Sequence, residues 1–230
     1  KDPKRLAFAD GEDEKVLRAV QVLVDEKLAR PILIGRPDVI EHRIKRLSLR
    51  LKENEDYEIT NPESDPRYAE YWSLYHDLME RQGVTPAIAR QEVRTEPTLI
   101  GALMVRRGEA DALICGLSGT YQDHYHFIYD VLGLKDEAGV AAAVNAIVLP
   151  KATVFITDTY LCHDPIAEQL AEITLQTAKL VARFGLEPKV ALLSHSNFGS
   201  SRSDSAQKMR DVLDIVRKRD HHLEIEGEMH

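Results

Sequence analysis

Short apolar runs rich in β-branched residues alternate with longer segments of helical period, and this alternation constrains the fold more than any other feature of the sequence. The first repeat has a strand at residues 6–9, a turn at Asp10-Gly11, and a helix whose apolar residues share one face. A second strand follows at 31–34. Because a helical crossover returns the chain to the same edge, successive strands run in one direction. The pattern therefore predicts an α/β fold with mainly parallel sheets.

The same periods place the remaining elements along the chain. Further strands are expected at 57–59, 112–115, 190–193 and 223–226, and helices at 37–49, 68–81, 85–93, 97–107, 121–132, 165–184 and 204–217. Residues 140–149 and 153–156, separated by Pro150-Lys151, predict an antiparallel hairpin, where one subdomain gives way to the next. We expect a first α/β lobe at 1–150 and a second at 151–230. A parallel sheet should continue beyond the last strand, so the second lobe is expected to be C-terminally truncated.

Composition excludes several classes of partner. The 230 residues carry a net charge of -8, which argues against nucleic acids and acidic membranes, because both are bound by broad basic surfaces. No apolar run approaches the roughly 20 residues of a membrane span. Cys115 and Cys162 form no C-x-x-C pair, so neither a disulfide nor a zinc site is expected. These features favour a cytoplasmic protein.

Three loops that follow predicted strands are candidates for ligand binding, because open parallel sheets bind ligands beyond the carboxyl ends of their strands. They are residues 116–120, 157–164 and 194–201. The first has two glycines and hydroxyl groups that suit a phosphate, and the third carries four serines, a histidine and an asparagine. A serine- and glycine-rich loop is also an ordinary turn, and Asp164-Pro165 is an ordinary helix start, so these alternatives stay open.

Charged residues could complete such a site. Arg94, Arg106, Arg107 and Arg202 could neutralise an anionic ligand, although a single arginine is more often a solvated surface group. His124 and His126 are two residues apart on a predicted helix and so lie on different faces, which argues against a metal site. The phosphate-loop, dinucleotide-binding, zinc-protease and serine-hydrolase motifs are absent.

Longer strings resemble a known family. LAFADGEDEKVLRA at 6–19, GALMV at 101–105 with GEAD at 108–111, and DPIAEQLA at 164–171 resemble phosphate acetyltransferase. Within that superfamily, LSHSNFG at 193–199 and EGEMH at 226–230 look like the phosphotransacetylase-type C-terminal domain of bacterial hybrid NADP-dependent malic enzymes. The resemblance covers nearly the whole chain.

The resemblance implies a two-lobed, three-layer α/β/α fold of the phosphotransacetylase and isopropylmalate dehydrogenase type, a cleft for acetyl-CoA, and a homodimer or higher oligomer. It also implies a parent enzyme that converts malate to pyruvate, CO2 and NADPH. In that enzyme NADP and Mg or Mn belong to a malic enzyme region that is absent from this sequence, and the present region senses acetyl-CoA as an effector.

The residues expected to contact acetyl-CoA follow from the resemblance and from the three loops. They are Arg94, Gly116, Ser118, Thr120, His126, Asp158, Ser194, His195, Ser196, Asn197, Phe198 and Gly199. No catalytic residue and no metal ligand is expected among them.

Departures from the family pattern favour sensing over catalysis. His126 stands where working transacetylases have an arginine, and the loop at 115–120 lacks a histidine and a threonine of the enzymes. A mostly neutral imidazole cannot clamp an acyl phosphate as a guanidinium does. We therefore expect a regulatory acetyl-CoA-sensing domain without transacetylase activity. An active phosphate acetyltransferase and a purely oligomerising scaffold remain the alternatives.

Overall fold

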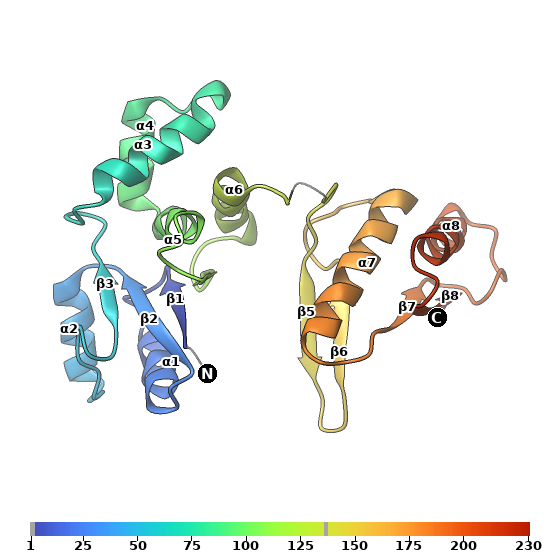
Figure 1. Ribbon diagram of the computed structural model, residues 1–230, viewed down its shortest axis with the longest axis horizontal. Coiled ribbons are helices and arrows are strands. Elements are labelled where there is room, and N and C mark those ends of the chain that lie inside the picture. Colours follow the sequence, from blue (N-terminus) through green and yellow to red (C-terminus); the bar gives the residue numbers. More distant parts are fainter. Residues whose placement is uncertain (1–2, 136–137) are drawn as a thin grey trace. The chain divides into compact units, whose positions relative to one another are not determined.

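The computed structural model describes residues 3–135 and 138–230 (Figure 1). The chain forms two compact units, unit 1 at Lys1–Gly133 and unit 2 at Leu134–His230. The hairpin was expected to straddle a boundary between residues 150 and 151, but both of its strands lie in unit 2. A boundary inside a hairpin would separate strands that share hydrogen bonds. The boundary between the two units lies before the hairpin, between Gly133 and Leu134.

Unit 1 is built on a sheet of four parallel strands (Figure 1). They are β1 (Lys4–Phe8), β2 (Ala29–Ile34), β3 (Glu58–Thr60) and β4 (Ala112–Ile114), in the order β3-β2-β1-β4. Leu6 of β1 lies between Pro31 of β2 and Ala112 of β4. The parallel sheet predicted from the alternation of strands and helices is confirmed.

Helices cover both faces of this sheet, because consecutive strand residues point to opposite sides. On one face α1 (Glu14–Asp25) and α2 (Pro37–Arg46) pack against Phe8 and Leu33. On the other, Ala7, Ile32 and Ile34 join a core formed by α3 (Tyr68–Met79), α4 (Pro86–Thr95), α5 (Pro97–Arg106) and α6 (Tyr121–Leu132). A short 3-10 helix, η1 (Glu80–Gln82), follows α3. Unit 1 therefore has the three-layer α/β/α arrangement.

Local sequence signals mark the helix starts. Thr85 caps α4, accepting a hydrogen bond from the Ile88 amide, and Pro86 occupies the first turn. Asp13 caps α1 in the same way, through the Lys15 amide. Asp13 lies in the loop that joins β1 to α1, whereas Thr85 lies between η1 and α4.

Unit 2 contains two separate pairs of strands. An antiparallel hairpin joins β5 (Val144–Val148) to β6 (Thr153–Thr157), which confirms the predicted hairpin. A parallel pair joins β7 (Lys189–Leu193) to β8 (Glu224–Met229). The helices α7 (Ala167–Arg183) and α8 (Asp204–Arg219) contribute Ala171, Val212 and Val216 to a core that also contains Leu192 and Ile225.

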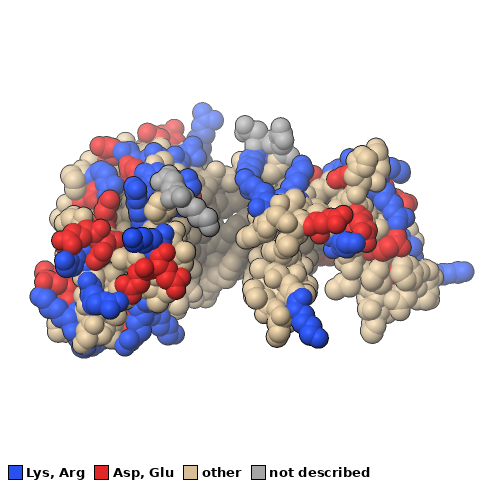
Figure 2. All heavy atoms as spheres, turned by 60° about the horizontal axis from the view of Figure 1, so that its bottom comes forward, with Lys and Arg blue, Asp and Glu red and all other residues tan. Residues whose placement is uncertain are grey.

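Charged side chains of both signs are interspersed on the face of unit 1 that Figure 2 shows. Many of them are paired, including Arg36 with Glu12 and Arg50 with Asp25. Across 3–135 and 138–230, the structure has no helix that is both long enough and apolar enough to cross a membrane.

Candidate functional site

A cavity of about 390 Å³ opens at the carboxyl edge of the unit 1 sheet. Its wall combines the segments that follow all four strands with the end of α4. The lining residues are Ala9, Asp10, Glu12, Asp13, Ile34, Gly35, Arg36, Arg43, Pro62, Glu63, Arg94, Pro97, Leu117 and Ser118. Two of the residues predicted to contact acetyl-CoA, Arg94 and Ser118, thus line one cavity, although α4 and the 116–120 loop are separated in sequence.

The carboxylate of Asp10 organises the loop after β4. Its Oδ2 accepts hydrogen bonds from the amides of Gly116 and Leu117, both at 3.2 Å, and its Oδ1 accepts one from the Ser118 hydroxyl at 3.1 Å. Gly116 has a φ of 103°, a left-handed conformation that favours glycine. Two amides and one hydroxyl of the loop that was expected to bind a phosphate are therefore already bound to a carboxylate of the chain itself.

Two other predicted ligand residues have partners on their own helix. Thr120 caps α6: its hydroxyl accepts from the Asp123 amide, and Asp123 Oδ2 accepts from the Thr120 amide at 2.9 Å. His126 donates from Nδ1 to the Gln122 carbonyl at 3.2 Å, and its ring contacts Phe127. Neither residue lines the cavity at the sheet edge.

His124 connects the loop to α5, a role that the sequence did not reveal. Its Nε2 lies 2.6 Å from the Ser118 carbonyl, and its Nδ1 lies 2.7 Å from the hydroxyl of the buried Thr98. A carbonyl only accepts hydrogen bonds, so Nε2 carries the proton that it donates, and in the neutral ring Nδ1 accepts from Thr98. The imidazole thereby holds Ser118 at the cavity wall.

Arg94 contributes an uncompensated positive charge to the cavity. Its guanidinium lies 4.7 Å from the centroid of the Tyr68 ring, and no carboxylate among the described residues pairs with it. Glu12, by contrast, binds Arg36, and this hydrogen bond lowers the pKa of the Glu12 carboxyl although burial opposes the shift. Arg94 is therefore free to bind an anion, whereas Arg36 is held by Glu12.

In unit 2 a buried carboxylate shapes the 194–201 loop. Glu228, in β8, is fully buried and accepts from the Ser196 hydroxyl at 2.7 Å, the Gly199 amide at 2.9 Å and Arg210 at 2.9 Å. The pKa of Glu228 lies below its usual range because the Gly199 amide and the Ser196 hydroxyl bind the charged form, with a further contribution from Arg210. Glu228 therefore holds this loop as Asp10 holds the loop of unit 1.

Most of the other residues of that loop are exposed. Phe198 is 66% exposed and has a φ of 46°, and its amide donates to the Glu228 carbonyl. Asn197 Oδ1 accepts from the His230 amide, and His195 Nε2 lies 3.2 Å from the Ser203 hydroxyl. Ser194 Oγ accepts from the Ser196 amide, which closes the turn. The side chains available to a ligand here are therefore chiefly Phe198, His195 and Asn197.

Asp158, another predicted ligand residue, binds the backbone of unit 2. Its carboxylate accepts from the amides of Ala143, Tyr160, Leu161 and Cys162, the last at 2.6 Å. Burial raises the pKa of Asp158, but these amides outweigh burial and hold the pKa below its usual range. Each of the three candidate loops is thus organised by an internal carboxylate, and each unit contains its own set of predicted residues.

A cluster of potential metal ligands is absent from the residues that the structure describes. Within the described ranges, no three or more His, Cys, Asp and Glu side chains form a group that could hold a metal ion. Cys115 and Cys162 are free, and burial raises the pKa of both thiols, which disfavours the reactive thiolate.

Comparison with known proteins places these sites in a family. The model of the phosphate acetyl/butaryl transferase family matches residues 1–230. The chain is 54% identical over 230 residues to an NADP-dependent malic enzyme of Escherichia coli, covering 100% of this chain and 30% of that protein. It is 49% identical over 226 residues to an NAD-dependent malic enzyme of Rhizobium meliloti, covering 98% of this chain and 29% of that protein. It therefore spans about 30% of the length of these relatives.

More distant matches include a phosphate acetyltransferase and a solved phosphotransacetylase. A phosphate acetyltransferase of Synechocystis is 30% identical over 224 residues, covering 97% of this chain and 32% of that protein. The solved phosphotransacetylase of Streptococcus pyogenes superposes with a TM-score of 0.87 at 24% identity, covering 99% of this chain and 68% of that one. The family model covers the whole chain and carries the assignment, and the solved structure shows that the fold is shared. The chain belongs to the phosphate acetyl/butaryl transferase family.

Proposed function

We propose that this chain is a regulatory region that binds acetyl-CoA within a cytoplasmic NADP-dependent malic enzyme and does not itself transfer acetyl groups. The parent enzyme would convert malate to pyruvate, CO2 and NADPH, using NADP and Mg or Mn in its malic enzyme region. Three relatives that bear this enzyme name are 52–54% identical over 98–100% of the chain, which supports the context.

The observation that carries binding without transfer is the position of Asp10. Transfer from acetyl-CoA to phosphate requires a site that holds the phosphate dianion beside the thioester. Asp10 occupies the amides of Gly116 and Leu117 and the hydroxyl of Ser118. A phosphate at that loop would have to displace a carboxylate and would be repelled by it. His126, where working transacetylases carry an arginine, supplies no permanent charge in compensation.

The same cavity retains features that suit a large anionic coenzyme. Its volume of about 390 Å³ is within the usual range of small-molecule sites. Arg94 offers hydrogen-bond donors that no described carboxylate binds. Two acidic side chains nearby already have partners within the chain, since Asp10 binds the 116–120 loop and Glu12 binds Arg36. A phosphate group of acetyl-CoA can therefore pair with Arg94. This binding does not require a second group that holds a free phosphate.

Regulation would act through a homo-oligomer. Binding at this region changes malate turnover only if acetyl-CoA prefers one quaternary state, so the proposed mechanism is a population shift between states of the oligomer.

Active phosphate acetyl transfer is the second candidate. It is favoured by the family match and by the phosphate acetyltransferases that are 28–30% identical over nearly the whole chain. A scaffold that only joins subunits is the third.

One set of measurements separates these candidates. The chain is titrated by calorimetry with acetyl-CoA, coenzyme A and acetyl phosphate, and is then assayed for acetyl transfer from acetyl phosphate to coenzyme A. We expect micromolar binding of acetyl-CoA, which corresponds to about -8 kcal/mol, and no transfer. Robust transfer would establish the acetyltransferase instead. If millimolar acetyl-CoA gives neither heat nor thermal stabilisation while the oligomer is intact, the scaffold is the remaining candidate function.

A further inference from the structure

The loop after β4 contains a two-residue segment, Leu117-Ser118, with a glycine at each end. Gly116 and Gly119 have φ angles of 103° and 86°, in the left-handed region that favours glycine. Both residues of the 117–118 segment line the cavity of about 390 Å³, and Leu117 is exposed. Because glycine also tolerates other backbone conformations, this piece of cavity wall can turn at both of its ends.

Side chains, rather than a backbone ladder, hold the segment in place. Asp10 accepts hydrogen bonds from the amides of Gly116 and Leu117 and from the Ser118 hydroxyl. His124 binds a group of the opposite kind, since its Nε2 donates to the Ser118 carbonyl at 2.6 Å. In the described part of the chain, neither residue of the segment makes a backbone–backbone hydrogen bond. The position of the segment therefore depends on Asp10 and His124.

His124 is itself fixed by the core of unit 1. Its Nδ1 lies 2.7 Å from the hydroxyl of Thr98, a buried residue of α5. Because Nε2 carries the proton for the carbonyl, Nδ1 of the neutral ring accepts from Thr98. A Cβ at Gly119 would lie 3.3 Å from Nε2, so the ring also packs closely against one end of the segment. His124 thus ties the segment to a core helix, whereas Asp10 ties it to the end of β1.

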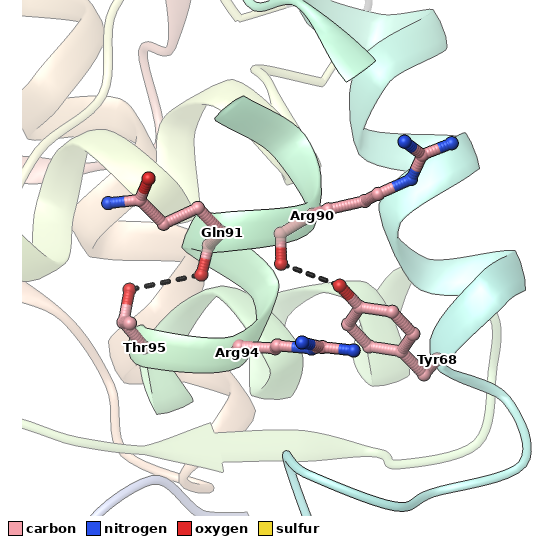
Figure 3. A pocket seen from close by; sticks show the side chains of 5 residues that line it. All are labelled: Tyr68, Arg90, Gln91, Arg94 and Thr95. Carbon is pink, nitrogen blue, oxygen red and sulfur yellow. Dashed lines mark hydrogen bonds between the residues drawn. The ribbon is translucent and has the colours of Figure 1, made fainter. Parts of the chain in front are cut away.

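Arg94, the cation on which the proposed acetyl-CoA site depends, is held separately from the segment. Its guanidinium lies against the Tyr68 ring, and Figure 3 shows the two side chains next to each other between α4 and α3. An anion that pairs with Arg94 can therefore bind while the 117–118 segment stays in place. An anion that needs the amides of the loop cannot, because Asp10 occupies them.

We propose that His124 is a positioning residue that, together with Asp10, latches the 117–118 segment and so determines which anions the cavity accepts. While the segment is latched, the two loop amides stay bound to Asp10 and are closed to a phosphate. Release of the Ser118 carbonyl lets the segment turn at its glycines, and the same movement withdraws the amides from Asp10. His124 touches neither amide, yet it controls whether they are open. The inference rests on the proposed function, because it concerns selectivity for acetyl-CoA over smaller phosphates in the same cavity.

Hydrogen exchange of the Gly116 and Leu117 amides, measured by NMR on the intact chain, tests the latch. His124→Leu should speed the exchange of both amides about tenfold, because a hydrogen bond that holds the segment is lost. His124→Gln should exchange at the wild-type rate, since its side-chain amide can still donate to the Ser118 carbonyl. The amide of Ala9, which donates to a carbonyl of β4, should be unchanged in both variants if the sheet is intact.

Two further variants test the geometry. His126→Leu removes the next histidine of α6, which bonds to the Gln122 carbonyl of its own helix, and should leave the exchange at the wild-type rate. Thr98→Val keeps His124 but removes the hydroxyl that orients its ring, and should speed the exchange severalfold. Thermal melting shows whether each variant is folded, and Thr98→Val decides the question if His124→Leu is not. Unchanged exchange in His124→Leu and Thr98→Val, or an equal acceleration in His126→Leu, would overturn the proposal.

A double-mutant cycle tests whether His124 and Asp10 hold the same segment. Acetyl phosphate, titrated by calorimetry, should bind severalfold more tightly to His124→Leu and to Asp10→Asn than to the wild type. The double variant should gain less than the product of the two single gains, since either change alone already loosens the segment. Gains that multiply, or no gain in His124→Leu, would contradict a shared latch.

The outcome is separable from that for acetyl-CoA. Faster exchange in His124→Leu, with no binding of acetyl-CoA by the wild type, would uphold the latch and refute the proposed function. Binding of acetyl-CoA by the wild type, with unchanged exchange in His124→Leu, would refute the latch alone.

Discussion

Asp10 is the residue whose charge most directly opposes a phosphate at the 116–120 loop. Asp10→Asn keeps an acceptor for the loop but removes the negative charge. Removing one charge about 4 Å from an anion in solvent is worth about 1 kcal/mol, or roughly fivefold in Kd. We expect acetyl phosphate to bind more tightly to the variant, as measured by calorimetry. Glu63→Gln, in the same cavity but not bound to the loop, is the control, and an equal gain there would exclude a specific role for Asp10.

Arg94 is the arginine on which the proposed acetyl-CoA site depends. Arg94→Ala removes a charge-assisted hydrogen bond and should weaken acetyl-CoA binding by about 1.5–3 kcal/mol. In the malic enzyme that the proposed function implies, malate turnover without effector should be unchanged, and the response to acetyl-CoA should be blunted. Dose-response curves of NADPH formation measure both quantities. Arg81→Ala, an exposed arginine of η1, serves as the control, and coincident curves for wild type and Arg94→Ala would contradict the assignment.

Glu228 predicts a pH dependence of stability. Its pKa is lowered in the folded chain, so its charged form stabilises unit 2 fully above the unfolded value of about 4.3, and this stabilisation is lost as the pH falls through the lower folded value. Glu228→Gln should therefore melt several degrees below wild type at pH 7, and the difference should shrink in acid. Melting curves between neutral pH and pH 3 test this expectation. If the difference in melting temperature stays constant across that range, the changed shape of the side chain, and not the loss of its charge, lowers the stability.

The turn between β1 and α1 requires glycine for steric reasons. A Cβ at Gly11 would lie 2.7 Å from the carbonyl oxygen of Ile34 and 2.8 Å from its amide nitrogen, both in the backbone of β2. Since backbone atoms of a central strand cannot move aside cheaply, Gly11→Ala should lower the free energy of unfolding by about 1–3 kcal/mol. Urea denaturation measures the change. Gly139→Ala is the control, because a Cβ there meets nothing within 4 Å; an equal loss in both variants would contradict the steric explanation.

The hydrogen-bonded loops follow one structural rule in both units. In unit 1 a carboxylate just beyond β1 holds the loop after the neighbouring β4, and in unit 2 a carboxylate within β8 holds the loop after the neighbouring β7. Neighbouring parallel strands end at the same edge, so an acid on one strand reaches the amides that follow the other. These loops are therefore preorganised by elements that are adjacent in space and distant in sequence.

At the scale of the whole molecule, each unit has its own core, and we expect two unfolding transitions. The cores of unit 1 surround its parallel sheet, whereas the core of unit 2 lies between α7, α8 and the β7–β8 pair. Trp72 reports only on unit 1, while far-ultraviolet circular dichroism reports on both. The two signals should give different midpoints in urea. Glu228→Gln should shift the dichroism transition and leave the Trp72 transition in place; coincident curves in both proteins would contradict independent units.

The amino-acid sequence was sufficient to predict the secondary structure and the class of fold. The signals behind this prediction are local: the spacing of apolar residues, the helix start at Thr85-Pro86 and the break at Pro150-Lys151. Local signals of this kind determine where helices and strands form. The α/β fold with parallel strands and the hairpin are confirmed. The sequence also marked Arg94 and Ser118, which the structure brings to one cavity.

Only the tertiary structure decided what the candidate loops bind. Asp10 is 106 residues from Gly116, and Glu228 is 29 residues from Gly199, so their contacts depend on which strands pair. Strand order in a parallel sheet is set by packing between distant segments and leaves no periodic trace in the sequence. The sequence therefore indicates loops rich in hydrogen-bond donors and predicts that those donors bind a ligand. The folded chain satisfies many of them with its own carboxylates, because neighbouring strands carry those carboxylates to the same edge.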